Sequence, residues 1–131
     1  MNELFDLGVS EVTLKSMIEL NPEILELSDK EVKEKEEILR LVGCNDKQVL
    51  SIISSNAMYL SRLNSDVIEL INYLNKIGFK TLRILFDSNP AILNLDVFEI
   101  RDYINDRMEN GESLEDIVDD LDSNTYLFNE M

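Results

Sequence analysis

The chain has 131 residues, of which 44% are hydrophobic, so it is long enough for one domain with its own core. Its 27 acidic and 12 basic residues give a formal charge of −15, the wrong sign for a protein that neutralises phosphates over most of its surface. The sequence contains no histidine, which excludes Ser-His-Asp and Cys-His nucleophile systems. Only four glycines and two prolines, with many Leu, Ile, Glu and Lys residues, predict an all-α fold.

Two long helices joined by a short turn are predicted first in chain order. The first helix runs from Glu11 to Leu20, with Ser10 as its N-cap. The Asn21-Pro22 step disfavours helix at the asparagine and lets the proline open a short helical turn at an angle. The second long helix starts at Ser28-Asp29-Lys30-Glu31, a capping box, and ends at Gly43.

The same pattern of helix signals returns along the rest of the chain. Asn45 and Gln48 form a capping box for a helix over 46–55, and a longer helix is predicted to begin at Ser65-Asp66. Asp96 with Glu99 starts the next long helix, and Ser113 starts the last one. Apolar residues at helical spacing in these segments are predicted to form the core.

An internal repeat accounts for this recurrence. Glycines stand at Gly8, Gly43, Gly78 and Gly111, in steps of 35, 35 and 33 residues. An asparagine follows each glycine, at Asn21, Asn56, Asn89 and Asn124. The repeats run over about 8–42, 43–77 and 78–110, with a half repeat at 111–131. One such unit cannot bury its apolar stripe alone, so we predict a single helical-repeat domain, 1–131, built as a solenoid of about three and a half helix–turn–helix repeats. The spacing of the repeats does not determine whether the solenoid is right- or left-handed.

The repeat resembles that of the mitochondrial transcription termination factor (mTERF) family. The segments that carry the resemblance are Leu20-Asn21-Pro22-Glu23-Ile24-Leu25 and Ser88-Asn89-Pro90-Ala91-Ile92-Leu93. The resemblance implies a left-handed solenoid that binds duplex DNA or RNA along a positively charged path. This chain differs from such proteins in its short length, its acidity and its lack of an organelle targeting segment. Pro22 and Pro90 carry over as packing residues and not as nucleic-acid contacts.

The C-terminal third is the most acidic part of the chain. Residues 84–131 hold 13 acids and 2 bases, a net charge of −11. We expect a face that attracts a basic protein surface, although a solvated face explains the same charges. The predicted face consists of Asp102, Asp106, Glu109, Glu112, Glu115, Asp116, Asp119, Asp120 and Asp122.

The middle repeat carries the opposite charge and supports an alternative function, nucleic-acid binding. Residues 47–83 hold 2 acids and 5 bases, a net charge of +3. The bases would form a patch near Phe79, and they are Lys47, Arg62, Lys76, Lys80 and Arg83. Their acidic flanks lie within a Debye length of about 8 to 10 Å, which weakens such a patch.

No pattern points to catalysis, so we expect no enzyme, no cofactor and no metal. Asp106 to Gly111 resembles a calcium loop but lacks its oxygen ligands. Glu36 and Glu37 are adjacent, and we place both on a charged helix face where nothing raises a pKa.

The start of the chain is not basic, and no long uncharged apolar segment is present, which predicts a cytoplasmic protein. Exposed apolar ends of a solenoid would also allow a homodimer.

Overall fold

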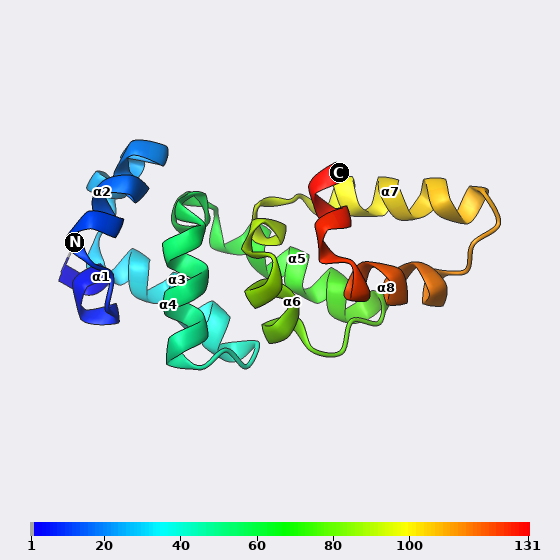
Figure 1. The fold of residues 1–131 in the computed structure, drawn as a ribbon, viewed down its shortest axis with the longest axis horizontal. Coiled ribbons are helices and arrows are strands. Elements are labelled where there is room, and N and C mark those ends of the chain that lie inside the picture. Colours follow the sequence, from blue (N-terminus) through cyan, green and yellow to red (C-terminus); the bar gives the residue numbers. More distant parts are fainter. Residues whose placement is uncertain (1) are drawn as a thin grey trace. The chain divides into compact units, whose positions relative to one another are not determined.

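The computed structural model of the protein describes residues 2–131 and contains no β-strand among them. Eight α-helices follow one another in pairs over this part of the chain, and a short 3₁₀ helix, η1 to η4, comes after each pair (Figure 1). Two compact units result: one ends at Asn64 and the other covers Ser65–Met131. The elements are α1 (Asn2–Leu7), α2 (Glu11–Leu20), η1 (Pro22–Glu26), α3 (Asp29–Leu41), α4 (Asp46–Ser55), η2 (Ala57–Ser61), α5 (Asn64–Ile77), α6 (Leu82–Ser88), η3 (Pro90–Asn94), α7 (Val97–Glu109), α8 (Leu114–Ser123) and η4 (Thr125–Glu130).

The predicted caps start the helices as expected. The Ser10 hydroxyl accepts a hydrogen bond from the backbone N–H of Thr13, which satisfies a donor that the helix itself leaves free. Full capping boxes open α3 at Ser28 and α4 at Asn45. Helix α5 begins at Asn64, one residue before the predicted start, and the Asn64 side chain hydrogen-bonds to α3.

The repeated glycines lie where one α-helix ends and the chain turns into the next. All four have a positive φ, for example 115° at Gly8 and 117° at Gly78, a conformation that side chains with a Cβ rarely adopt. At Gly8 a Cβ would also lie 3.2 Å from a methyl carbon of Leu50. The spacing of the glycines therefore marks the helix boundaries.

Each asparagine of the repeat stands between a first helix and its short 3₁₀ turn. Pro22 and Pro90 open η1 and η3, as predicted. However, η2 and η4 begin at Ala57 and Thr125, so the turn forms without a proline. The break lies at the asparagine, where φ is −143° at Asn21 and −140° at Asn56, far from helical values.

In the first unit, the apolar stripes of successive repeats pack on one another. Helix α2 packs on α4, η1 packs on η2, and the short α1 packs against α3. The side chains of Met17, Ile24, Leu39, Ile52 and Ile53 are almost completely buried. Truncating such a residue to Ala costs about 2 to 5 kcal/mol, so this shared core accounts for the stacking of the repeats.

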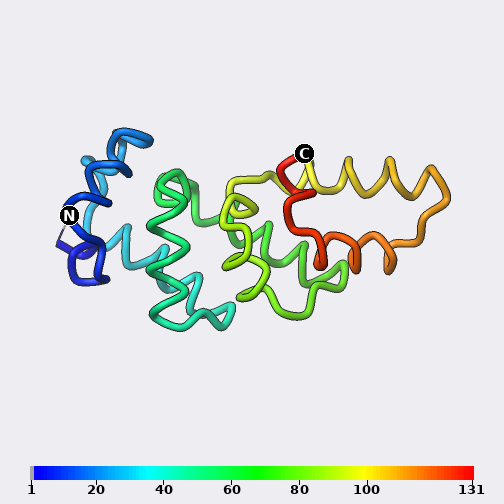
Figure 2. The backbone as a smooth tube through the Cα atoms, viewed as in Figure 1, coloured from blue at the N-terminus to red at the C-terminus, as the bar shows by residue number. Residues whose placement is uncertain are grey.

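The second unit repeats the arrangement. Helices α7 and α8 lie side by side as a hairpin, which Figure 2 shows as a backbone that turns back on itself, and η3 packs on η4. Phe86, Leu121 and Phe128 are buried there, and the Phe128 ring lies 6.0 Å from that of Phe79.

Candidate binding surfaces

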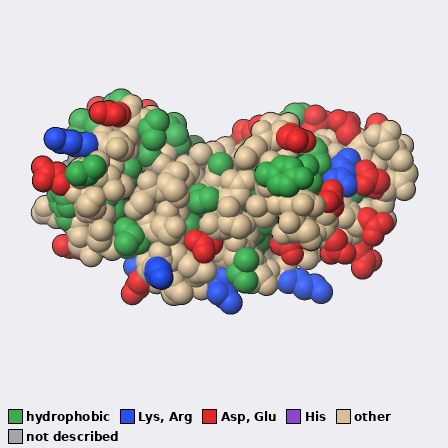
Figure 3. Space-filling view, in the orientation of Figure 1, with side chains coloured by type: hydrophobic (Ala, Val, Ile, Leu, Met, Phe, Trp, Pro, Cys, Tyr) green, Lys and Arg blue, Asp and Glu red, His purple; other side chains and the backbone are tan. Residues whose placement is uncertain are grey.

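The nine predicted acids all lie on the α7–α8 hairpin. Three are on α7, Glu112 is in the connecting loop, and five are on α8. Figure 3 shows acidic side chains gathered over this hairpin. We define these nine residues as the α7–α8 acidic face; that it binds a partner stays a prediction.

Arg107 neutralises two of the nine acids. Its guanidinium donates to Glu112 Oε1 and Oε2 at 2.5 and 2.8 Å, to Asp120 Oδ2 at 2.9 Å and to the Tyr103 hydroxyl at 3.0 Å. These hydrogen bonds lower the pKa of the Glu112 carboxyl; at Asp120, the hydrogen bond from Asn124 lowers the pKa first and Arg107 adds to it. Within residues 2–131, the other seven acids of the face are exposed and form no ion pair.

A groove runs along α7 beside these acids. Phe98, Asp102 and Asp106 are spaced by four residues, so they lie on one face of the helix and line the groove. Tyr103 and Met131 complete its apolar part, and its volume is about 340 Å³. The Phe98 side chain is 71% exposed, although it is large and apolar. The groove thus combines an aromatic anchor with carboxylates.

The five predicted bases are divided between the two units. Lys47 on α4 and Arg62 at the end of η2 belong to the first unit. Lys76, Lys80 and Arg83 surround the corner between α5 and α6 in the second unit. Whether the five act as one patch stays a prediction. Their expected aromatic neighbour, Phe79, is only 4% exposed, so its ring is not available to stack on a base.

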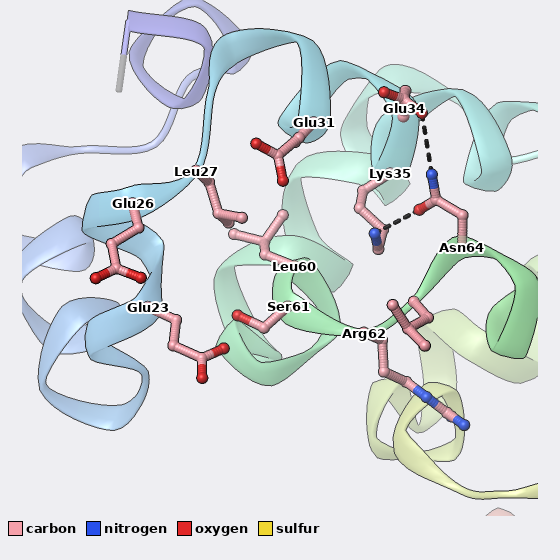
Figure 4. Close-up of a pocket in the computed structure, with 11 residues that line it drawn as sticks. Glu23, Glu26, Leu27, Glu31, Glu34, Lys35, Leu60, Ser61, Arg62 and Asn64 are labelled. Carbon is pink, nitrogen blue, oxygen red and sulfur yellow. Dashed lines mark hydrogen bonds between the residues drawn. The ribbon is translucent and has the colours of Figure 1, made fainter.

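The first unit holds a groove that the sequence analysis did not identify. It lies between η1, the start of α3 and η2, and its volume is about 390 Å³. Figure 4 shows Glu23 and Glu26 on one side and Ser61 and Arg62 on the other, with Leu27 and Leu60 between them. Glu31, Glu34, Lys35, Leu63 and Asn64 complete the lining. We call it the η1–η2 groove.

A buried lysine forms one wall of this groove. Lys35 is 5% exposed, and its ammonium donates to Asn64 Oδ1. Asn64 Nδ2 in turn donates to Glu34 at 3.0 Å (Figure 4). Burial lowers the pKa of Lys35, while the charges of Glu34 and Glu31 oppose this shift. The sequence contained a signal for this burial, because Val32, Lys35 and Leu39 are spaced by three and four residues and so lie on one face of a helix.

The burial of Glu36 contradicts the expectation that Glu36 and Glu37 both lie on a charged helix face. Glu37 is exposed, but Glu36 is 2% exposed and faces α1. Its pKa is raised to about 7, first by burial and then by the nearby Glu3 carboxyl, against the lowering effect of Arg40. That expectation was wrong because α1 covers this part of α3.

Within residues 2–131, no three acidic or cysteine side chains are grouped so that they could hold a metal ion. In the same part of the chain, no helix is both long and apolar enough to cross a membrane. Cys44 is buried and forms no disulfide.

Comparison with known proteins confirms the predicted family. The mTERF family model matches residues 1–120. A search of curated proteins found no match. The alternation of long helices, asparagine-led turns and glycine corners, together with this match over most of the chain, shows that the protein belongs to the mTERF family.

Proposed function

We propose that the protein is a non-catalytic binding module that recognises a basic protein surface through the α7–α8 acidic face. The observation that carries the proposal is the groove on α7, where the exposed Phe98 ring stands beside Asp102 and Asp106. Neither carboxylate has an ion-pair partner within the described residues. A protein partner with an apolar side chain flanked by lysine or arginine would match both features.

The two features contribute in different ways. Covering an exposed aromatic ring removes apolar area from water, at about 25 cal/mol per Å², and such anchors dominate binding energy. The surrounding carboxylates mainly accelerate encounter and select against acidic partners. We therefore expect Phe98 to control the dissociation rate and the acids to control the salt dependence of association.

Capture from the protein's own cell lysate, treated with nuclease, tests the proposal. The immobilised wild-type chain is compared with Phe98→Ser, with Asp102→Asn/Asp106→Asn, and with the control Glu69→Gln/Asp87→Asn. The control removes the same charge from exposed positions of the same unit. A basic protein that is lost with the first two variants and retained with the control supports the proposal. Equal retention by all variants contradicts it.

Nucleic-acid binding is a second candidate. Lys76, Lys80 and Arg83 are exposed at the α5–α6 corner and form no ion pair within the described residues. Family membership favours this candidate, because nucleic acid is the usual ligand of the family. Each phosphate contact would make the slope of log K against log salt concentration more negative by about 0.9. Fluorescence anisotropy with a labelled DNA duplex tests it: binding that Lys80→Glu/Arg83→Glu abolishes would support this function.

A further inference from the structure

The η1–η2 groove has an apolar centre with charged edges. Leu27 and Leu60 lie side by side in the groove (Figure 4), and Leu63 at its rim is 67% exposed. Its volume of about 390 Å³ falls in the range of pockets that take a few side chains of a partner. Exposed leucine in a concave site is a feature of interaction surfaces.

The charges at the edges are mainly negative, and two of them are free. Glu31 closes the capping box of α3 with Ser28, and Glu34 accepts a hydrogen bond from Asn64. Glu23 and Glu26, in contrast, are exposed and form no hydrogen bond or ion pair within residues 2–131. Their charges are not offset by Lys35, whose ammonium is turned to Asn64.

We propose that the η1–η2 groove is a second docking site, which receives a basic segment of a protein partner. An apolar side chain of that segment would cover Leu27 and Leu63, above the buried Leu60, and a lysine or arginine on either side of it would face Glu23 and Glu26. Lysine and arginine suit such a site because their aliphatic stems pack on leucine while their charged ends stay at the rim. The inference rests on the proposed function, since it assigns further contacts to the same class of partner.

The arrangement of Lys35 supports this choice of occupant. Its stem is buried in the wall of the groove and its ammonium reaches a polar edge formed by Asn64 and Glu34. The chain thus already holds the stem of one lysine in the groove wall with its ammonium at a polar edge, as we propose for a lysine of the partner. An acidic segment would instead meet four glutamates and be repelled.

A peptide-binding assay tests the proposal directly. The probe is a fluorescein-labelled peptide of about ten residues, in which leucine pairs alternate with lysine pairs, and binding is followed by anisotropy. Glu23→Gln/Glu26→Gln and Leu63→Ala are each expected to weaken binding about fivefold, a change of about 1 kcal/mol. The control Glu19→Gln/Glu37→Gln removes two exposed charges outside the groove and is expected to bind as the wild type does.

Two results would overturn the proposal. One is unchanged binding by Leu63→Ala, and the other is an equal loss in the groove variant and the charge-matched control. Amide chemical shifts provide a second measurement, because the peptide should perturb Leu27, Ser61 and Leu63 before residues elsewhere in the first unit. Far-UV circular dichroism of each variant establishes that it is folded.

The same assay separates this proposal from the proposed function. If Asp102→Asn/Asp106→Asn weakens peptide binding and the groove variants do not, the groove proposal fails and the α7 site stands. If only the groove variants weaken binding, the groove is the docking site and the α7–α8 acidic face is not.

Discussion

The side-chain amide of Asn21 donates a hydrogen bond to the main-chain carbonyl of Ala57, 36 positions later, at 3.0 Å. The same nitrogen donates to Ser61 Oγ at 2.7 Å. The equivalent asparagine of the second unit, Asn89, donates to the carbonyl of Thr125 at 2.9 Å and to Asn129. Asn21 and Asn89 therefore each end one helix and tie the turn that follows to the turn of the next repeat.

We predict that Asn21→Ala lowers the free energy of unfolding by about 1 to 3 kcal/mol. Asn21 is 3% exposed, so the substitution leaves the buried carbonyl of Ala57 without its donor. Chemical denaturation measures the change. Asn124→Ala is the control, because within residues 2–131 the Asn124 side chain hydrogen-bonds only to Asp120 of the preceding helix α8, and it is expected to cost less than Asn21→Ala. Equal losses would show that the asparagine serves only to end the helix.

A second buried hydrogen bond joins η2 to α3. The Tyr59 hydroxyl donates to the main-chain carbonyl of Lys35 at 2.7 Å, and the tyrosine side chain is completely buried. Tyr59→Phe keeps the ring and removes only this donor, so we expect a loss of about 1 to 2 kcal/mol in unfolding free energy. Thermal unfolding by circular dichroism tests this, with the exposed Tyr126→Phe as the matched control. No difference between the two variants would contradict the prediction.

The repeat was predictable from the sequence because its signals are local. The glycine that turns the chain at Gly43 and the capping box at Ser28 act through neighbouring residues, so spacing alone locates them. The burial of Glu36 was missed because the adjacent glutamates were placed on a charged face, whereas tertiary packing covers Glu36 as it covers Lys35. The η1–η2 groove requires residues of two repeats, and the local pattern contains no information on how repeats meet.

Two glycine substitutions separate backbone strain from steric contact. At Gly78 an added Cβ would meet no atom within 4 Å, so Gly78→Ala reports only the cost of a side chain at φ 117°. That cost is about 1 to 2 kcal/mol. Gly8→Ala has a similar φ and also brings a Cβ to 3.2 Å from Leu50, so we expect it to be the more destabilising of the two. Urea unfolding compares them, and a stable Gly78→Ala variant would show that the corner accommodates another conformation.

The raised pKa of Glu36 predicts how the free energy of unfolding depends on pH. Its pKa is about 7 in the folded protein, compared with 4.5 for an ordinary glutamate, because it is buried and lies near Glu3. Between these two values the folded state binds more protons than the unfolded state, so the free energy of unfolding falls as the pH rises from about 4.5 to 7. Arg40, whose Nη1 lies 3.3 Å from Glu36 Oε1, limits the fall, and Lys33 lies 3.8 Å from Glu3.

Glu36→Gln should therefore remove this decline and be more stable than the wild type at pH 8, by on the order of 2 kcal/mol, since the amide stays neutral. Near pH 4 the two proteins should be similar, because the wild-type carboxyl is then protonated. The melting temperature measured from pH 4 to 8 tests this. Glu37→Gln, one residue along the same helix but exposed, is the control and should follow the wild-type curve. If Glu36→Gln also followed it, the Glu36 carboxyl would not be the source of the pH dependence.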